Sequence, residues 1–246
     1  MILIFRYGYY FCSFFLLLLY RAEISNCLST KVLVVGSVNA DITIDVEEYP
    51  KQGETIVAKD TPESGSLAAG GKGANQAVAC RRLGVDTVFL CQFGKDGYSN
   101  FLESTLKENH VDISNCKITN RSSGLGLIFK DSSGGVSCVV LGGSNSKWPE
   151  QEILYHNIHD LILKQNNKIG CILLQMEVPQ YVNEIISEIA SKYSIPIFQD
   201  AGGNDIDLST GHIQRCAFLS PNLTELKRLT KMEASTEEEI ILCTNY

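Results

Sequence analysis

The sequence predicts one α/β domain built around a mostly parallel β-sheet, beginning near residue 31. After that point, strand-like apolar runs alternate with helix-like stretches, as in proteins whose strands are joined by crossover helices. The runs at 31–35 and 171–176 are apolar without polar alternation, which is typical of strands covered on both faces. With 246 residues the chain is long enough to bury a sizeable core.

The expected elements of this layer follow from periodicity and punctuation. Its strands are predicted near Val34, at 88–93, and near Ile172, Ile197 and Phe218, and its helices at 73–83, 97–109, 150–165, 180–193 and 223–231. In the helix at 150–165, Leu154, Ile158 and Leu161 follow the helical period, so this helix should pack on the sheet. His156 and His159 are then surface residues rather than ligands.

A second, smaller sheet is expected from segments that alternate or carry β-branched residues, at 42–47, 54–59, 126–130 and 137–141. The glycine-containing turn at 131–135 joins the last two segments. Residues 66–69 make a poor strand by the same criteria.

Composition excludes several classes of function. The net charge is −7 and the basic residues are scattered, so nothing suggests binding to nucleic acid. The nine cysteines show no C-x-x-C spacing, so neither a zinc site nor a disulfide framework is indicated. A reduced, cytoplasmic protein is the simpler interpretation.

Residues 1–30 have a different character. An apolar run at 9–20 lies between Arg6 and Arg21, short for a membrane span and suitable in length for the core of a signal peptide. The small-residue cleavage pattern is missing, so we expect an extension unrelated to the fold. The alternative is a working signal for the secretory pathway, and contact with a membrane is expected only if 9–20 acts as an anchor.

Residues 70–75, Gly-Gly-Lys-Gly-Ala-Asn, indicate a binding site at the start of a helix. Glycines allow a ligand to approach the backbone, and the first N–H groups of a helix lack intrahelical partners. The segment is not a Walker A loop, because Ser66 and Gly73 stand where glycine and Ser or Thr are required. Gln76 replaces the third glycine of a dinucleotide fingerprint. The alternative is a flexible loop.

Polar side chains also follow two predicted strands, at the end where open α/β sheets bind ligands. Asp41 suits two neighbouring sugar hydroxyls as acceptor, and Asn39 both donates and accepts. Glu177 ends the strand at 171–176. The alternatives are that Asp41 caps a turn and that Glu177 is an ordinary carboxylate at a helix start.

Asn222 and Glu225 lie three residues apart at the positive end of a predicted helix. A carboxylate there suits indirect contact with a phosphate-bound Mg²⁺ ion, which keeps several waters. Taken without further context, the pair is a helix cap with its reciprocal partner.

Five segments together resemble the ribokinase/phosphofructokinase-B family of carbohydrate kinases, from about residue 31 to the end. They are residues 36–41, 53–55, 70–76, 174–177 and 220–225, in the family's order and at compatible spacing. The resemblance implies a three-layer α/β/α fold with a mostly parallel central sheet and a small β-sheet lid, formed by about 42–60 and 124–142.

The resemblance also implies an activity, the transfer of the ATP γ-phosphate to ribose to give ribose 5-phosphate. It assigns the sugar to Asn39, Ala40, Asp41, Gly70, Gly71, Lys72, Gly73, Asn75 and Glu177, and the nucleotide to Asn222 and Glu225, with Glu225 near Mg²⁺. A K⁺ ion, a homodimer formed through the lid strands, and a cytoplasmic, nuclear or organellar location are further expectations. For Lys72 the alternative is a solvated loop lysine.

One departure from the family concerns catalysis. The family's Gly-Ala-Gly-Asp segment, which carries the base and an anion hole, is absent from this sequence, so the last βα units are expected to be missing. Asp200 also ends a predicted strand, but the family gives that position no such role. We therefore expect a chain without activity on its own; the alternative is a short form that binds sugar or a partner chain without catalysis. Residues 235–242 are expected to begin a further helix, with a Thr236–Glu239 capping box.

Overall fold

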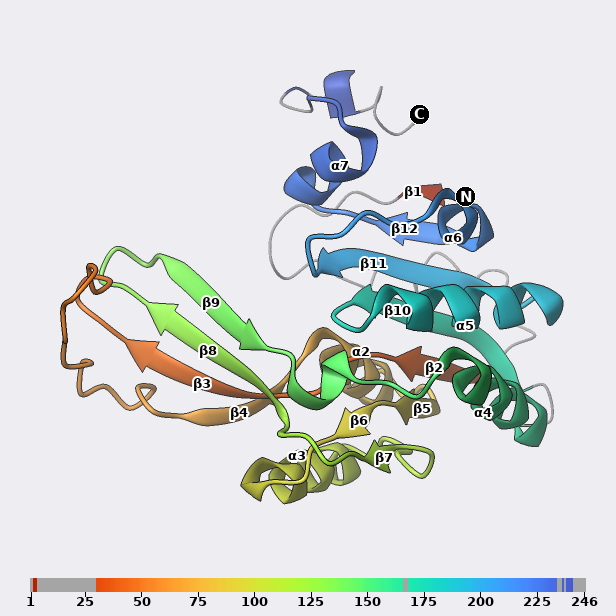
Figure 1. Ribbon diagram of the computed structural model, residues 1–246, viewed down its shortest axis with the longest axis horizontal. Coiled ribbons are helices and arrows are strands. Elements are labelled where there is room, and N and C mark those ends of the chain that lie inside the picture. The colour runs from red at the N-terminus through yellow and green to blue at the C-terminus, as the bar shows by residue number, and fades with distance from the viewer. Residues whose placement is uncertain (1, 4–29, 166–167, 234–235, 237, 241–246) are drawn as a thin grey trace.

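The computed structural model describes residues 2–3, 30–165, 168–233, 236 and 238–240, and has a parallel six-stranded sheet at its centre (Figure 1). The strand order is β1 (Ile2–Leu3), β12 (Phe218–Ser220), β11 (Ile197–Gly203), β10 (Ile169–Met176), β2 (Lys31–Val35) and β5 (Thr87–Leu90). Every pairing in this sheet is parallel, which confirms the predicted sheet type.

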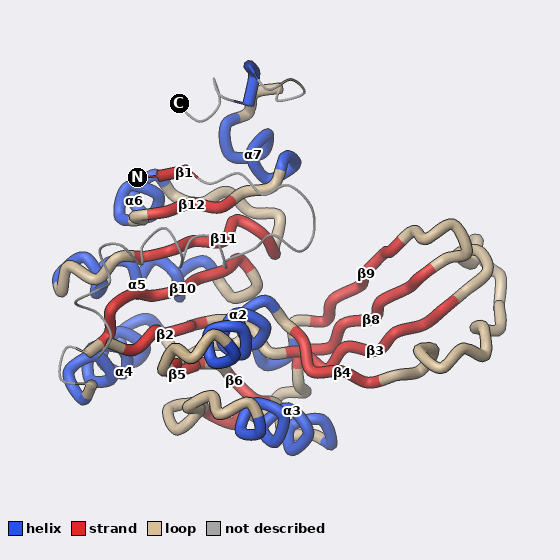
Figure 2. Tube along the Cα trace, turned by 180° about the vertical axis from the view of Figure 1, so that it is seen from behind, coloured by secondary structure: helices blue, strands red, loops and turns tan. Residues whose placement is uncertain are grey.

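Helices cover both faces of this sheet because its strands are apolar on both sides. In β2, Leu33 and Val35 join the core under α4 (Gln151–Lys164) and α5 (Gln180–Lys192). The intervening Val32 and Val34 join the core under α2 (Lys72–Arg82) and α3 (Gly97–Glu108). Figures 1 and 2, seen from opposite sides, show α4 and α5 in front in one view and α2 in front in the other. The predicted three layers are confirmed.

The lid is a second sheet that projects to one side of the central sheet (Figure 1). Its strand order is β4 (Leu67–Gly70), β3 (Asn39–Asp45), β8 (Gly124–Lys130) and β9 (Val136–Leu141). A two-stranded sheet, β6 (Gln92–Phe93) with β7 (Lys117–Ile118), and the short helix η3 (Gly143–Ser146) connect lid and core.

The structure corrects the predicted lid strands. Residues 54–59 form no strand, whereas residues 67–70 form β4. Val57 is 92% exposed, so β-branched residues alone, without a neighbour to pack on, did not make a strand. The small residues of β4 succeed because they pair with β3 beside the bulkier Asp41, which their lack of side-chain volume accommodates.

Most predicted helix ends agree with the structure within one or two residues. Two other features differ from the sequence prediction. The strand expected at 88–93 is two strands, because β2 ends at Val35 and offers β5 no partner beyond Leu90. The short helix α6 (Thr210–Arg215) was not predicted.

At the carboxyl-terminal end, α7 (Leu223–Thr230) lies where a helix was expected. Thr236 and Glu239 exchange the two hydrogen bonds of the predicted capping box. The helix expected at 235–242 otherwise falls largely outside the described residues.

The amino-terminal extension is described only at residues 2–3, where β1 pairs with β12. This pairing contradicts an extension wholly unrelated to the fold. The apolar run at 9–20 lies outside the described residues. Within the part of the chain that the structure describes, no helix has the length and apolar character needed to cross a bilayer.

Candidate functional site

Glu177 is the centre of a junction at the carboxyl ends of β2 and β10, which are neighbours in the sheet. Its Oε2 accepts a hydrogen bond from Ser37 Oγ at 2.5 Å and another from the Lys72 backbone N–H at 2.9 Å. Lys72 is the first residue of α2, whose N-cap, Gly71, offers no side chain. Glu177 therefore satisfies an N–H of α2 that would otherwise lack a partner. The alternative given for Glu177 was an ordinary carboxylate at the start of the helix that follows it, which is α5. In the structure, Glu177 instead accepts a backbone N–H from the start of α2.

The glycines before and within α2 are required by the protein's own packing. A Cβ on Gly71, whose φ is +89°, would lie 3.0 Å from Ser37 O, and one on Gly73 would lie 2.7 Å from Ser37 N. Gly73 N also donates weakly to Ser37 Oγ at 3.4 Å. The sequence suggested that these glycines make room for a ligand; the structure shows that they let α2 press against the turn after β2.

Asp41 lies within β3 between two glycines of the flanking strands. A Cβ on Gly70 would fall 1.8 Å from Asp41 Oδ2, and one on Gly126 would fall 2.3 Å from Oδ1. Burial, with a smaller contribution from the charge of Glu177, raises the pKa of Asp41 to about 6. The two carboxylates are thus near enough to repel each other.

The alternative of Asp41 as a turn cap is wrong, because Asp41 sits in a strand. Among the described residues, no donor hydrogen-bonds to its carboxylate. This group is a half-buried acceptor whose oxygens are available to a ligand.

Asn39 is buried and already partly engaged. Its Oδ1 accepts a hydrogen bond at 2.8 Å from Asn145 Nδ2, so the amide nitrogen is the part left for a ligand. Asn145, in η3, also bonds both backbone polar groups of Val38. Sequence reasoning missed Asn145 and Ser37 as supporting residues, because each acts on partners more than 100 residues away.

Two other predicted sugar residues have more limited roles than expected. The Ala40 side chain is fully buried in the core on the α2 side, so only its backbone could meet a ligand. Asn75 is exposed on the first turn of α2 and lies beside a cavity of about 440 Å³ between α2 and α3.

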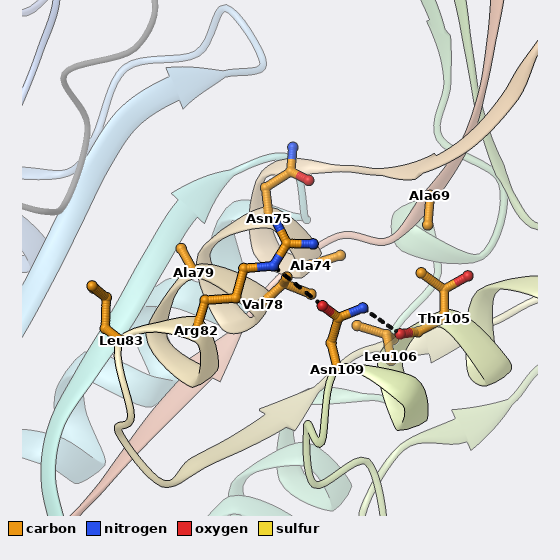
Figure 3. Close-up of a pocket in the computed structure, with 10 residues that line it drawn as sticks. All are labelled: Ala69, Ala74, Asn75, Val78, Ala79, Arg82, Leu83, Thr105, Leu106 and Asn109. Atoms are coloured by element: carbon orange, nitrogen blue, oxygen red, sulfur yellow. Dashed lines mark hydrogen bonds between the residues drawn. The ribbon is translucent and has the colours of Figure 1, made fainter.

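That cavity is distinct from the Asp41–Glu177 junction. Its lining residues are Ala69, Ala74, Asn75, Val78, Ala79, Arg82, Leu83, Thr105, Leu106 and Asn109. Figure 3 shows Arg82 bonded to Asn109 within it, at 3.3 Å, and the Asn75 carboxamide pointing away from that pair. Asn75 thus borders the cavity without directing its amide at the polar residues inside.

At the nucleotide end, Asn222 and Glu225 form the capping box of α7. Glu225 accepts from Asn222 N at 2.7 Å and from Asn222 Nδ2 at 2.8 Å, and its own N–H donates to Asn222 Oδ1 at 2.9 Å. The helix-cap interpretation is therefore confirmed, and any role toward a nucleotide must be compatible with it.

Lys72 extends from α2 toward this end of the sheet. Its ammonium lies 3.9 Å from Oδ2 of Asp200, which lies within β11, and the Lys72 side chain is only 34% exposed. The alternative that Lys72 is a freely solvated lysine on a loop is therefore wrong, because Lys72 begins α2 and its ammonium faces Asp200.

Comparison with known proteins places the chain in one family. Residues 29–245 match the pfkB family of carbohydrate kinases. Ribokinase from Arabidopsis thaliana is 36% identical over 214 residues, which are 85% of this chain and 54% of the relative. Ribokinase from Haemophilus influenzae is 28% identical, over 85% of this chain and 65% of the relative. The chain thus spans little more than half to two thirds of these curated relatives.

Solved structures give the same result. The structure of Arabidopsis thaliana ribokinase complexed with ribose and ATP superposes with a TM-score of 0.75 at 33% identity, covering 89% of this chain and 68% of that one. The chain belongs to the pfkB family of carbohydrate kinases.

Proposed function

We propose that this chain forms the sugar-binding part, and a portion of the nucleotide-binding part, of a kinase that transfers the γ-phosphate of ATP to ribose. The single observation that carries the proposal is the approach of the Asp41 and Glu177 carboxylates at the carboxyl edge of the sheet, beside the Asn39 amide. The relative that superposes well was solved with ribose and ATP, which supports the same pair of ligands.

The proposed division of labour follows from what phosphoryl transfer requires. The protein has to place a sugar hydroxyl in line with the γ-phosphate and to offset charge on the phosphate oxygens. In this proposal Asp41, Asn39 and Lys72 bind the sugar together with Asn75 and Glu177. Gly70, Gly71 and Gly73 fix the start of α2, which carries Lys72 and Asn75, and Ala40 contributes through its backbone.

Polar recognition of this kind discriminates between sugars. If a sugar lacks a hydroxyl that Asp41 binds, the half-buried carboxylate is left without a partner, which costs far more than a lost apolar contact. We therefore propose ribose as the substrate in preference to other sugars, such as fructose, and to nucleosides, such as adenosine.

The nucleotide end is proposed to use Asn222 and Glu225. Both Glu225 oxygens already accept hydrogen bonds, so contact with Mg²⁺ is proposed to run through water, and the ion would neutralise phosphate charge. Within the described residues, no group of three or more His, Cys, Asp or Glu side chains is arranged so that it could hold a metal ion. K⁺ rests on the family resemblance alone.

We further propose that residues 1–246 alone turn over substrate negligibly, because this sequence contains no Gly-Ala-Gly-Asp segment to supply the base. A homodimer through the lid and a cytoplasmic location, where ATP is available, complete the proposal. The alternative function, a form that binds sugar or a partner chain without catalysis, shares the same sugar site.

Calorimetric titration of the 246-residue chain with ribose, fructose and adenosine tests the binding proposal. We expect ribose to bind most tightly and the Asp41→Ala variant to lose at least about tenfold in affinity. An absence of ribose binding to the folded parent chain would overturn the proposal. ATP-dependent turnover near that of a full-length ribokinase would overturn the proposed lack of activity.

A further inference from the structure

Three charged side chains from distant parts of the chain meet above Gly202 in β11. A Cβ on Gly202 would lie 2.7 Å from Lys72 Nζ, 2.9 Å from Asp200 Oδ1 and 2.9 Å from Glu225 Oε1. The ammonium of Lys72, the first residue of α2, therefore lies beside the carboxylate of Glu225, which caps α7. A side chain at position 202 would therefore have to displace at least one of these three groups.

Asp200 is the member of this cluster to which no role has been assigned. Its side chain is 6% exposed, so its charge needs nearby compensation to be tolerated. The Gly202 N–H donates to Asp200 Oδ1 at 2.7 Å, and the other oxygen, Oδ2, faces Lys72 Nζ at 3.9 Å. The carboxylate is thus fixed by the backbone on one side and directed at the lysine on the other.

Neighbouring strands bring this cluster next to the sugar junction. A Cβ on Gly203 would lie 2.8 Å from Glu177 N, so the end of β11 presses against the end of β10. The Lys72 backbone is held by Glu177 and its ammonium lies beside Asp200. The lysine side chain therefore crosses from the sugar junction to the start of α7.

We propose that Asp200 is a positioning residue, which holds the Lys72 ammonium between the Asp41–Glu177 junction and the start of α7. The effect on ribose binding rests on the proposed function, whereas the ion pair between Asp200 and Lys72 does not. Without Asp200 the long lysine side chain regains its rotamers, and its ammonium is no longer placed where sugar and phosphate meet.

The ion pair is tested first without any ligand. The parent chain and the Asp200→Asn variant are labelled with an amine-reactive ester, and modification of Lys72 relative to Lys107 is followed by mass spectrometry. Asparagine keeps the acceptor for Gly202 N–H, so the variant removes charge and little else. We expect Lys72 to react about two- to fivefold faster in the variant, the range expected for loss of a partly exposed ion pair.

Asp205→Asn is the control, since Asp205 lies two residues after the end of β11 and pairs with a different cation, Arg228, at 2.8 Å. It should leave the relative labelling of Lys72 unchanged. Equal labelling in the parent chain and Asp200→Asn, with both folded by circular dichroism, would overturn the assignment.

The consequence for the sugar is tested by ribose calorimetry on Asp200→Asn, Lys72→Met and the double variant. Each single change should weaken ribose binding about fivefold, as for moderately coupled sites. If the two residues act together, the double variant should bind ribose about as tightly as the single variant with the lower affinity. Unchanged affinity in Asp200→Asn, or additive losses, would contradict positioning. If the parent chain binds no ribose, the proposed function fails, while the labelling result still decides the ion pair.

Discussion

At the scale of single residues, the site depends on Asp41 being held in a strand between two glycines. Gly70 and Gly126 bring neighbouring backbone so close that the carboxylate is half-buried, and burial raises its pKa to about 6. A group held in this way destabilises the empty protein at neutral pH and is available to a ligand. Two effects of pH follow from this one shift.

Sugar affinity should fall in mild acid. Ionised Asp41 accepts hydrogen bonds from sugar hydroxyls at both oxygens, whereas protonation near pH 6 removes the charge and turns one of these acceptors into a donor. We expect ribose to bind about tenfold more weakly at pH 5 than at pH 8, following the ionised fraction of the carboxyl. Calorimetry across this range measures the profile. A flat profile in the parent chain would contradict the role of Asp41.

Stability should change in the opposite sense. The pKa of Asp41 is higher in the folded protein than its ordinary value of 3.8, so this residue favours folding most below pH 4 and loses that contribution as pH rises through 6. The Asp41→Asn variant should therefore melt at a higher temperature than the parent chain at pH 7. The difference should disappear toward pH 4. Thermal unfolding followed by circular dichroism at several pH values checks both statements.

Gly70 should tolerate no side chain. A Cβ there would fall 1.8 Å from Asp41 Oδ2, so Gly70→Ala must displace the carboxylate or the strand. We expect a loss of about 1–3 kcal/mol in the free energy of unfolding, as in overpacked cores, together with weaker ribose binding. Gly97→Ala is the control, since nothing lies near its Cβ and it begins a helix. Denaturation in urea compares the two; equal stabilities would contradict this account.

At the scale of elements, two helix starts are completed by carboxylates placed differently in the sequence. The first N–H of α2 is accepted by Glu177, 105 residues away, whereas α7 is capped by its own Asn222 and Glu225. Both carboxylates lie at the positive ends of helix dipoles, where anionic groups are favoured. The local pair can be recognised from spacing; the distant one cannot.

Substitutions at Asn222 should separate capping from nucleotide binding. Asn222→Ala removes the cap and should cost about 1 kcal/mol in the free energy of unfolding, whereas serine is a good cap and should cost much less. If Asn222 also serves the nucleotide, Asn222→Ser should still weaken ATP binding severalfold. Urea denaturation and ATP calorimetry give the two readings. Parent-like ATP affinity in Asn222→Ser would reduce this residue to a cap.

At the scale of the whole molecule, one face of the lid carries a row of apolar side chains that ends in the exposed Val139. Ile42, Leu127 and Val139 are direct neighbours across three strands, on the side opposite Asp41, Gly126 and Val140. All residues of the edge strand β9 are exposed. A second copy of the chain is the partner that the proposed lid-mediated dimer would place against this face.

A charge on the apolar face should prevent that association. We expect Val139→Lys to shift the chain to monomer in sedimentation velocity, because Val139 is 54% exposed on β9 beside Leu127. Val57→Lys, at a loop position that is 92% exposed, is the control and should not change the oligomeric state. If the parent chain sediments as a monomer, the proposed dimer is wrong.

Sequence alone gave much of the central sheet because uninterrupted apolar runs and helical periods are local signals. It also predicted that Asp41 and Glu177 lie near each other, since polar residues after buried strands meet at one edge of a parallel sheet, and the charge of Glu177 contributes to the raised pKa of Asp41. It failed at β4, because alanines and glycine have weak strand propensity and pair only where Asp41 fills the space beside them. It could not find Asn145, or the pairing of Asp200 with Lys72, because both depend on partners far along the chain.

By itself, then, the sequence determined the layer architecture, the order of the main elements and the polar groups that end the strands, because these depend on patterns within a few residues. Only the tertiary structure decided which of these groups act together. It directed Glu177 to α2, buried Ala40, raised the pKa of Asp41 and brought Lys72 beside Asp200 and Glu225. Charge interaction and burial depend on distances through space, and spacing along the chain does not contain them.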